Sequence, residues 1–138
     1  MPTLISYRKH IDALITRELR LPEDENHQRL GQEIATVDGT TYVSLPDGAV
    51  LPADQPDEIA ASIETVTLTD TLREAIKAAS PQVRLINTTV AEKIAASYSM
   101  ADEIKLLRTA PSAEFEAYNA HAEACRAWGR EQKAALGL

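Results

Sequence analysis

Two Asp-Gly dipeptides separate short runs of β-forming residues in the first half of the chain, and they restrict the fold more than any other feature. The sequence reads EIATV before Asp38-Gly39, TTYVSL after it, and AVL after Asp47-Gly48. Glycine tolerates the positive φ of a tight turn, so an Asp-Gly pair between such runs predicts antiparallel strands. We therefore expect an antiparallel meander with strands at 34–37, 40–45 and 49–51.

The segments around this meander carry other patterns. Residues 4–20 repeat apolar side chains at helical spacing, which predicts an amphipathic helix that ends before Pro22. The apolar face of this expected helix consists of Leu4, Tyr7, Ile11, Leu14 and Ile15. The polar segment 22–32 is typical of a loop, and 52–58, with two prolines, of a connector. The alternating run SIETVTL at 62–68 predicts a fourth short strand.

Helix signals replace strand signals after residue 69. Thr69 or Asp70 stands where an N-cap is needed for the amphipathic run that follows. Ser80-Pro81 reads as a second N-cap followed by a first-turn proline, which has no amide hydrogen to leave unsatisfied. From there, apolar residues at spacings of three and four predict a helix over 82–97.

The stretch YSMADEIKLLR predicts a further, short helix. Ser99 stands three residues before Asp102, a variant of the capping box that fixes where the helix begins. Its apolar stripe consists of Met100, Ile104 and Leu107. Lys105 and Arg108 complement its C-terminal end. Folding alone explains the cap and the apolar stripe; in the alternative, Lys105 and Arg108 border a surface that a partner protein uses.

These patterns together predict an α+β protein: an N-terminal helix and a small antiparallel β-meander, followed by a C-terminal helical bundle or hairpin. A chain of 138 residues matches the common size of one domain. We expect a single domain, 1–138, with a helix-plus-meander subregion at 1–69 and a helical subregion at 70–138.

The charge distribution bears on the class of partner. The net charge is −7, and residues 21–69 hold ten acidic residues against one arginine, which gives −9 for that segment. Such a surface repels phosphate backbones and disfavours nucleic-acid binding. The acidic segment is interpreted as a solvated face, with a basic partner as the alternative. No apolar run approaches membrane-spanning length and no signal-peptide pattern opens the sequence, so we expect a cytoplasmic protein that meets no membrane.

The last expected helix starts at Pro111-Ser112, ends at Gly137 and carries half of the aromatic residues. Its seam recurs at steps of three and four residues and consists of Phe115, Tyr118, Ala122, Cys125 and Trp128 or Gly129. We expect this seam to pack on the 82–97 helix. The alternative is that part of it, with Lys105 and Arg108, contacts another chain.

The residues offer no catalytic or ligand-binding constellation. The three histidines have no partners at metal-ligand spacing, and the five glycines are isolated, so we expect no metal, no cofactor and no enzymatic activity. Cys125 is the one cysteine, and His121 precedes it by one helical turn. A hydrolase that uses this pair is the third and least favoured hypothesis, because a small cysteine on a seam is usually packed rather than reactive.

The C-terminal half resembles small phage and prophage proteins of the tail or tail-fibre assembly region. The matching features are Leu85-Ile86, the YSMADEIKLLR helix and the EFEAYNAHAEACRAW helix with Lys133 and Leu136, over residues 80–138. The run TYVSLPDGAVLP is similar to the N-terminal part of such proteins. The resemblance implies a protein of the infected or lysogenic host cell, virion-associated in one variant, that acts by contact with tail or tail-fibre proteins. It brings no catalytic residues.

Two hypotheses of function follow. In the first, the protein is a tail-fibre assembly factor or minor tail component that binds a tail or fibre protein through its last two helices. In the second, it is a self-associating structural or regulatory protein unrelated to tails, a homo-oligomer that uses the same seam in an antiparallel helix pair.

Overall fold

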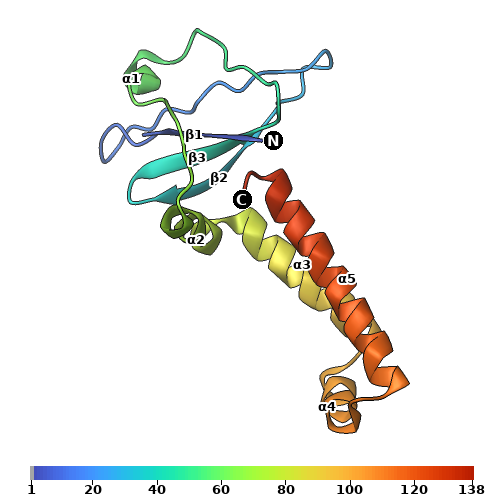
Figure 1. Ribbon diagram of the computed structural model, residues 1–138. Coiled ribbons are helices and arrows are strands. Elements are labelled where there is room, and N and C mark those ends of the chain that lie inside the picture. The colour runs from blue at the N-terminus through green and yellow to red at the C-terminus, as the bar shows by residue number, and fades with distance from the viewer. Residues whose placement is uncertain (1) are drawn as a thin grey trace. The chain divides into compact units, whose positions relative to one another are not determined.

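The computed structural model, described here for residues 2–138, is an α+β protein with its strands in the N-terminal half (Figure 1). The strands are β1 (Thr3–Tyr7), β2 (Gln32–Val37), β3 (Thr40–Leu45) and β4 (Glu64–Thr65). The helices are α1 (Asp57–Ala60), α2 (Asp70–Ala79), α3 (Pro81–Ser97), α4 (Met100–Thr109) and α5 (Ala113–Ala135). The predicted fold class is confirmed.

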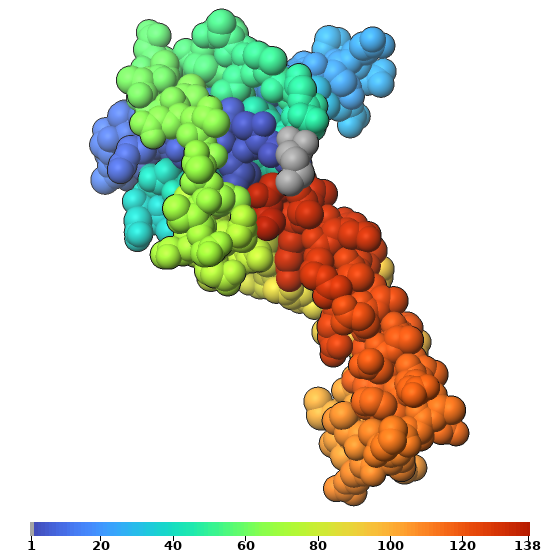
Figure 2. Space-filling view, viewed as in Figure 1, coloured from blue at the N-terminus to red at the C-terminus, as the bar shows by residue number. Residues whose placement is uncertain are grey.

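The chain divides into two compact units. The sheet unit comprises Met1–Gln82 with Ala135–Leu138, and the helical unit comprises Val83–Ala134. In the helical unit, α3 and α5 run side by side and α4 lies at the end of the hairpin that they form, where its surface is open in the space-filling view (Figures 1 and 2). The prediction of a single domain stays a prediction.

The sheet is antiparallel throughout, in the order β2-β3-β1-β4. The hairpin between β2 and β3 turns at Asp38 (φ 50°) and Gly39 (φ 78°), so both central residues have the positive φ of a tight hairpin turn. The strands predicted at 34–37 and 40–45 are confirmed, and β2 begins two residues earlier. The fourth strand is confirmed as β4, which pairs with β1.

The strand predicted at 49–51 is wrong. These residues form no strand, although Ala49 and Leu51 pack against the core. The reason lies in the strand order: β3 already pairs with β2 on one edge and with β1 on the other, so no edge of β3 is left for the segment that follows it. The turn after Leu45 therefore leads away from the sheet.

The N-terminal helix predicted over 4–20 is also wrong. Residues 3–7 form β1, a central strand that is buried on both faces, so its side chains show no strand alternation. After it, the Asp12 carboxylate accepts hydrogen bonds from the backbone N–H groups of Leu14 and Ile15, a local turn that competes with helix formation. Of the expected apolar face, Leu4 and Tyr7 are buried in β1, but Ile11, Leu14 and Ile15 are exposed, so the five residues do not form one buried surface.

The core of the sheet unit lies on one face of the sheet. It consists of Ile5, Tyr7, Leu19, Val43, Leu45 and Ile59, with Leu21, Ala49, Leu51 and Ile63 at its margin. Helix α2 packs against β2, and its Ile76 is fully buried. On the chain's return, Gly137 (φ 88°) lies close to Leu4 of β1.

The predicted helix starts are confirmed. The Thr69 side chain accepts a hydrogen bond from the backbone N–H of Leu72 and caps α2, and Pro81 is the first residue of α3. The last helix, α5, begins at Ala113, and the Ser112 hydroxyl accepts from the backbone N–H of Phe115. Each cap satisfies a backbone donor that the first helical turn leaves free.

Replacement of Gly31 by alanine should destabilise the sheet unit. Gly31 has φ 102°, and a Cβ there would lie 2.6 Å from the backbone oxygen of Ser44. Gly48 also has positive φ (81°) but nothing within 4 Å of an added Cβ, so Gly48→Ala is the matched control. We expect Gly48→Ala to lower the free energy of unfolding by about 1–2 kcal/mol, and Gly31→Ala to cost about 1–3 kcal/mol more, measured by urea denaturation. Equal losses would contradict the close contact.

Candidate functional site

The small residues of the α5 seam are buried within the helical unit. Ala122, Cys125 and Gly129 are the buried residues of α5. A Cβ at Gly129 would lie 2.7 Å from Val90 Cγ2 and 3.7 Å from Ile86 Cγ2, so α3 and α5 approach closely at this point. The prediction that the seam packs on the 82–97 helix is confirmed here, and this part of the seam is not open to another chain.

The ring nitrogen nearest the Cys125 thiol also lies against a backbone carbonyl oxygen. Its Sγ lies 3.7 Å from His121 Nε2, and the same nitrogen lies 3.3 Å from the backbone oxygen of Lys93. A carbonyl oxygen only accepts, so a hydrogen bond to Lys93 requires a proton on Nε2, and that nitrogen then cannot take the thiol proton. The geometry therefore gives no support to a cysteine hydrolase.

The aromatic residues of α5 are half-buried and form two separate contacts. Tyr118 meets Tyr98 edge-on, with ring centroids 4.9 Å apart, and Phe115 lies 6.3 Å from Tyr118. Further along α5, the Lys93 ammonium lies 3.6 Å from the centroid of the Trp128 ring, which places a cation over its face. Burial, followed by hydrogen bonding to Glu103, raises the pKa of Tyr118. This cluster connects α3, α4 and α5.

Helix α4 is held at its start but buries none of its ten residues. The Ser99 hydroxyl accepts from the backbone N–H of Asp102, and the Asp102 carboxylate accepts from the backbone N–H of Ser99, so the predicted capping box is confirmed. Lys105 and Arg108 are exposed, as are three large apolar residues: Met100 (77%), Ile104 (48%) and Leu107 (62%). Such a row of apolar side chains on one helix face is typical of an interaction surface.

A groove runs between α4 and α5 on the side away from those apolar residues. We call it the α4–α5 groove; it has a volume of about 440 Å³ and is lined by Ser97, Tyr98, Asp102, Lys105, Leu106, Glu114 and Ala117. Its floor is apolar, and charged side chains of both helices stand at its margin. Of the predicted seam, Lys105 lines the groove, and Phe115 and Tyr118 form the aromatic cluster that holds Tyr98.

Sequence reasoning missed the groove because no single helix contains it. Tyr98, Leu106 and Ala117 come from three different segments, and their proximity depends on how the hairpin turns between α3 and α5. The one available signal was Leu106, an apolar residue of YSMADEIKLLR that lies outside the predicted stripe. Arg108 does not line the groove; it flanks the exposed apolar row instead.

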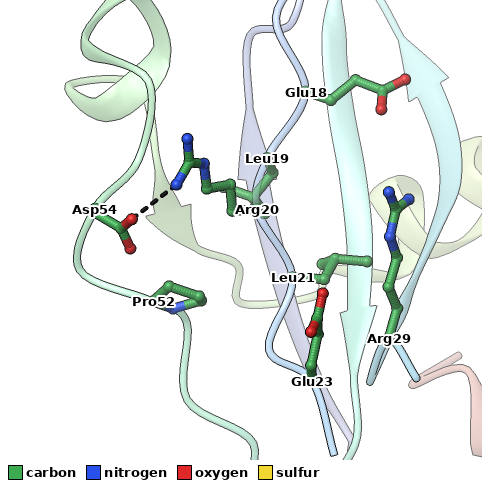
Figure 3. A pocket seen from close by; sticks show the side chains of 8 residues that line it. All are labelled: Glu18, Leu19, Arg20, Leu21, Glu23, Arg29, Pro52 and Asp54. Carbon is green, nitrogen blue, oxygen red and sulfur yellow. Dashed lines mark hydrogen bonds and ion pairs between the residues drawn. The ribbon is translucent and has the colours of Figure 1, made fainter. Parts of the chain in front are cut away.

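The sheet unit has a larger pocket of about 620 Å³, which sequence reasoning also missed (Figure 3). It is lined by Glu18, Leu19, Arg20, Leu21, Glu23, Arg29, Pro52 and Asp54. Figure 3 shows Arg20 reaching Asp54, with an ion-pair distance of 2.7 Å. Carboxylates and guanidinium groups alternate around this pocket, so it presents neither a consistent charge nor an apolar floor to a ligand.

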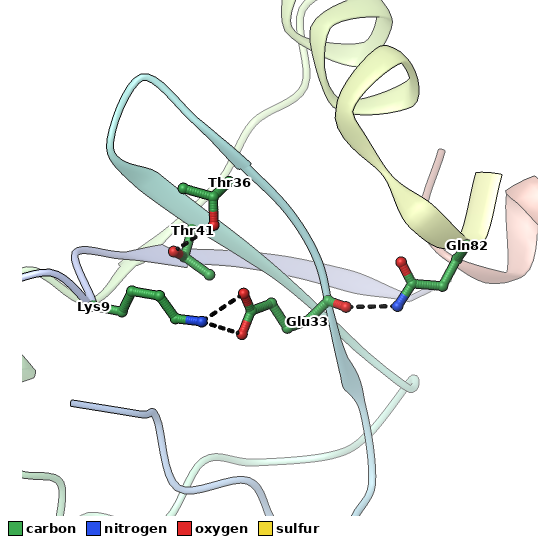
Figure 4. A network of polar contacts seen from close by, with 5 residues as sticks. All are labelled: Lys9, Glu33, Thr36, Thr41 and Gln82. Atoms are coloured by element: carbon green, nitrogen blue, oxygen red, sulfur yellow. Dashed lines mark hydrogen bonds and ion pairs between the residues drawn. The ribbon is translucent and has the colours of Figure 1, made fainter. Parts of the chain in front are cut away.

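A second group of polar side chains lies along β2 and is explained by folding (Figure 4). Lys9 Nζ contacts both Glu33 carboxylate oxygens at 2.7 and 2.8 Å. Burial, the largest single influence, acts to lower the pKa of Lys9, but the hydrogen bond to Glu33 and the negative charge of the same carboxylate together outweigh it, so the pKa is raised. Gln82 Nε2 donates to the Glu33 backbone oxygen at 2.7 Å, which satisfies an acceptor on an edge strand.

Comparison with known proteins gives no match to a family model, to a curated protein or to a solved structure. Within residues 2–138, no helix combines the length and the apolar character that crossing a membrane requires. Among the same residues, histidine, cysteine, aspartate and glutamate side chains form no group of three that could hold a metal ion. The candidate site, given by the exposure of α4 and by the pocket beside it, consists of α4, with its exposed apolar row, and the α4–α5 groove.

Gly129→Ala should destabilise the helical unit despite the higher helix propensity of alanine. The added Cβ meets Val90 Cγ2 at 2.7 Å, and we expect a net loss of about 1–2 kcal/mol in the free energy of unfolding. Val90→Ala removes the contacted methyl group, so Gly129→Ala/Val90→Ala should lose less than the sum of the single variants. A Gly129→Ala protein as stable as the wild type in denaturant titrations would contradict the close packing.

Ser99→Ala should raise the pKa of Asp102. Hydrogen bonds to the backbone and then to the side chain of Ser99 hold that pKa below 3.8, its ordinary value. A lowered carboxyl pKa stabilises the fold above the unfolded-state pKa, and this contribution is lost as pH falls through the folded-state pKa. Ser99→Ala removes the hydroxyl bond and leaves the backbone bond, so the pKa should rise partway.

The measurement is an NMR titration of the Asp102 carboxyl carbon. Ser112→Ala is the matched control, because it removes the cap of α5 and leaves the Ser99–Asp102 pair intact. An Asp102 pKa that is the same in Ser99→Ala and in the wild type would show that the capping box does not form in solution.

Proposed function

We propose that this chain is a non-enzymatic protein-binding module whose client is a phage tail or tail-fibre protein. The observation that carries the binding role is the α4–α5 groove, with an apolar floor between charged side chains at the exposed end of the helical unit. The resemblance of residues 80–138 supplies the class of client. The module acts as a tail-fibre assembly factor or as a minor tail component, in the host cell and, if the client retains it, in the virion.

The groove suits a protein client for physical reasons. Tyr98 lies in the groove and is held edge-on by Tyr118, so little side-chain freedom remains to be lost on binding. Aromatic residues in such pockets are frequent hot spots of protein interfaces. Asp102, Lys105 and Glu114 at the margin offer charges of both signs, which orient a polypeptide and reject partners with the wrong charge pattern.

The second hypothesis, a self-associating protein, is supported by a separate observation. The exposed apolar row of α4 lies outside the groove, and the exposed Arg108 flanks it. In this hypothesis the contact between copies uses α4 and not the buried residues of the α5 seam. Both kinds of contact are compatible in one molecule, because they use different sides of α4.

The proposal is tested by affinity capture with a groove variant. Ala117→Arg places a long cation in the groove, and Ala124→Arg puts the same side chain at an exposed position of α5 that does not line it. Each tagged protein captures partners from prophage-induced source cells, and mass spectrometry quantifies them. We expect the wild type and Ala124→Arg to retain a tail or fibre protein in near-stoichiometric amount, and Ala117→Arg to lose about tenfold or more, the scale of one hot-spot residue.

Three results would contradict the proposal. If the folded wild type captures no tail or fibre protein, the assigned client is wrong. If Ala117→Arg captures the client as well as Ala124→Arg does, the client does not bind in the groove. If the tagged wild type captures only further copies of its own chain, the result supports the self-associating alternative instead.

A further inference from the structure

A cavity on one flank of the α3–α5 pair has positive side chains and no negative ones. Helices α3 and α5 run side by side (Figure 1), and the cavity, of about 260 Å³, lies beside the close contact between Val90 and Gly129. We call it the basic cavity; it is lined by Asn87, Val90, Arg126, Gly129, Arg130 and Lys133. Three of these residues are cations and none is acidic, although the chain has a net charge of −7.

The three cations come from successive turns of α5. Arg126 stands three residues before Gly129, Arg130 follows Gly129 directly, and Lys133 stands four residues after it, so the three side chains leave the same side of the helix. Gly129 has no side chain, so the backbone of α5 forms part of the cavity wall. Asn87 stands one turn before Val90 on α3 and adds a side-chain amide from the facing helix.

A nearby carboxylate balances only part of this charge. Arg130 Nη2 donates to Glu123 Oε1 at 2.5 Å, and Glu123 does not line the cavity. The hydrogen bond from Arg130, followed by the charges of Arg130 and Arg126, lowers the pKa of Glu123, so one carboxylate serves two guanidinium groups. Lys133 is half-buried and forms no ion pair within residues 2–138. Three cations against one carboxylate leave a charge of +2.

This arrangement costs stability in the absence of a ligand. Residues three and four apart on a helix are neighbours, so Arg130 repels both Arg126 and Lys133. Local conflicts without a compensating contact are expected at functional sites, where a ligand completes the set of interactions. An anion in the cavity would replace the repulsion among the three cations with attraction.

We propose that the basic cavity binds a phosphate monoester. Guanidinium groups present parallel N–H donors that match phosphate oxygens, and a lysine ammonium acts as a further point charge. A phosphate monoester carries about −1.5 to −2 charges at pH 7, which balances the charge of the cavity, whereas one carboxylate balances half of it. The volume lies below the roughly 300–1,000 Å³ of pockets for drug-sized ligands, so the part of the ligand that enters is small.

The basic cavity and the α4–α5 groove have no lining residue in common. The anion site is therefore a further site in addition to the proposed function, and neither depends on the other. The phosphate group belongs either to a free small molecule or to a phosphorylated side chain of another protein, and the recognition chemistry is the same in both cases.

Isothermal titration calorimetry of the full chain with glycerol 3-phosphate tests the proposal. Arg126→Gln/Lys133→Gln removes two cations of the cavity, and we expect it to weaken binding by about tenfold or more, the scale of lost hydrogen bonds to charged groups. Arg29→Gln/Lys77→Gln is the matched control, because it makes the same change in net charge in the sheet unit and should leave the affinity unchanged. Circular dichroism verifies that both variants are folded.

Two further ligands define the chemistry. Glycerate carries a carboxylate in place of the phosphate on a similar three-carbon body, and we expect it to bind at least tenfold more weakly. A peptide Gly-Gly-phosphoserine-Gly-Gly distinguishes the sources: tighter binding than glycerol 3-phosphate supports a phosphorylated protein, and weaker binding supports a free small molecule.

NMR of the wild type locates the ligand without any substitution. Glycerol 3-phosphate should shift the backbone amide of Gly129 and the side-chain amide of Asn87, and should leave the amide of Gly48 in the sheet unit unchanged. Shifts confined to other residues overturn the proposal. The absence of saturable binding at millimolar ligand overturns it as well, as does an equal loss of affinity in the two double variants. Glycerate that binds as tightly as glycerol 3-phosphate shows that the site does not select phosphate.

Discussion

The backbone hydrogen bonds of β1 hold the sheet unit together. This strand pairs with β3 over all five of its residues and with β4 over Ile5 and Ser6, so both of its edges are used. Without it, the sheet would reduce to the β2–β3 hairpin, and an isolated two-stranded hairpin is at best marginally stable in water. The core side chains beneath the sheet gain their burial only because β1 brings Ile5 and Tyr7 over them.

The central position of β1 also explains which parts of the fold can be predicted from sequence. Asp38-Gly39 demands a local backbone geometry, and Thr69, Ser99 and Ser112 satisfy local donors, so each of these features acts over a few residues and was predicted correctly. The segment LISY is decided instead by partners about 40 and 60 residues away. Its apolar spacing fits a helix until those partners are known.

The same distinction holds in the helical unit. Helical spacing placed Ala122, Cys125 and Gly129 on one face of α5, and α3 approaches that face closely at Val90. The spacing could not show that Trp128 lies under the Lys93 ammonium. The groove was beyond sequence reasoning, because Tyr98, Leu106 and Ala117 meet only after the chain has turned at both ends of α4.

Helix α4 has two usable sides because its start is fixed. The reciprocal hydrogen bonds between Ser99 and Asp102 set the first turn, and each residue then follows at 100° around the helix axis. With the start fixed, Leu106 faces the groove while Ile104 faces solvent, so the two sides of one short helix carry different surfaces.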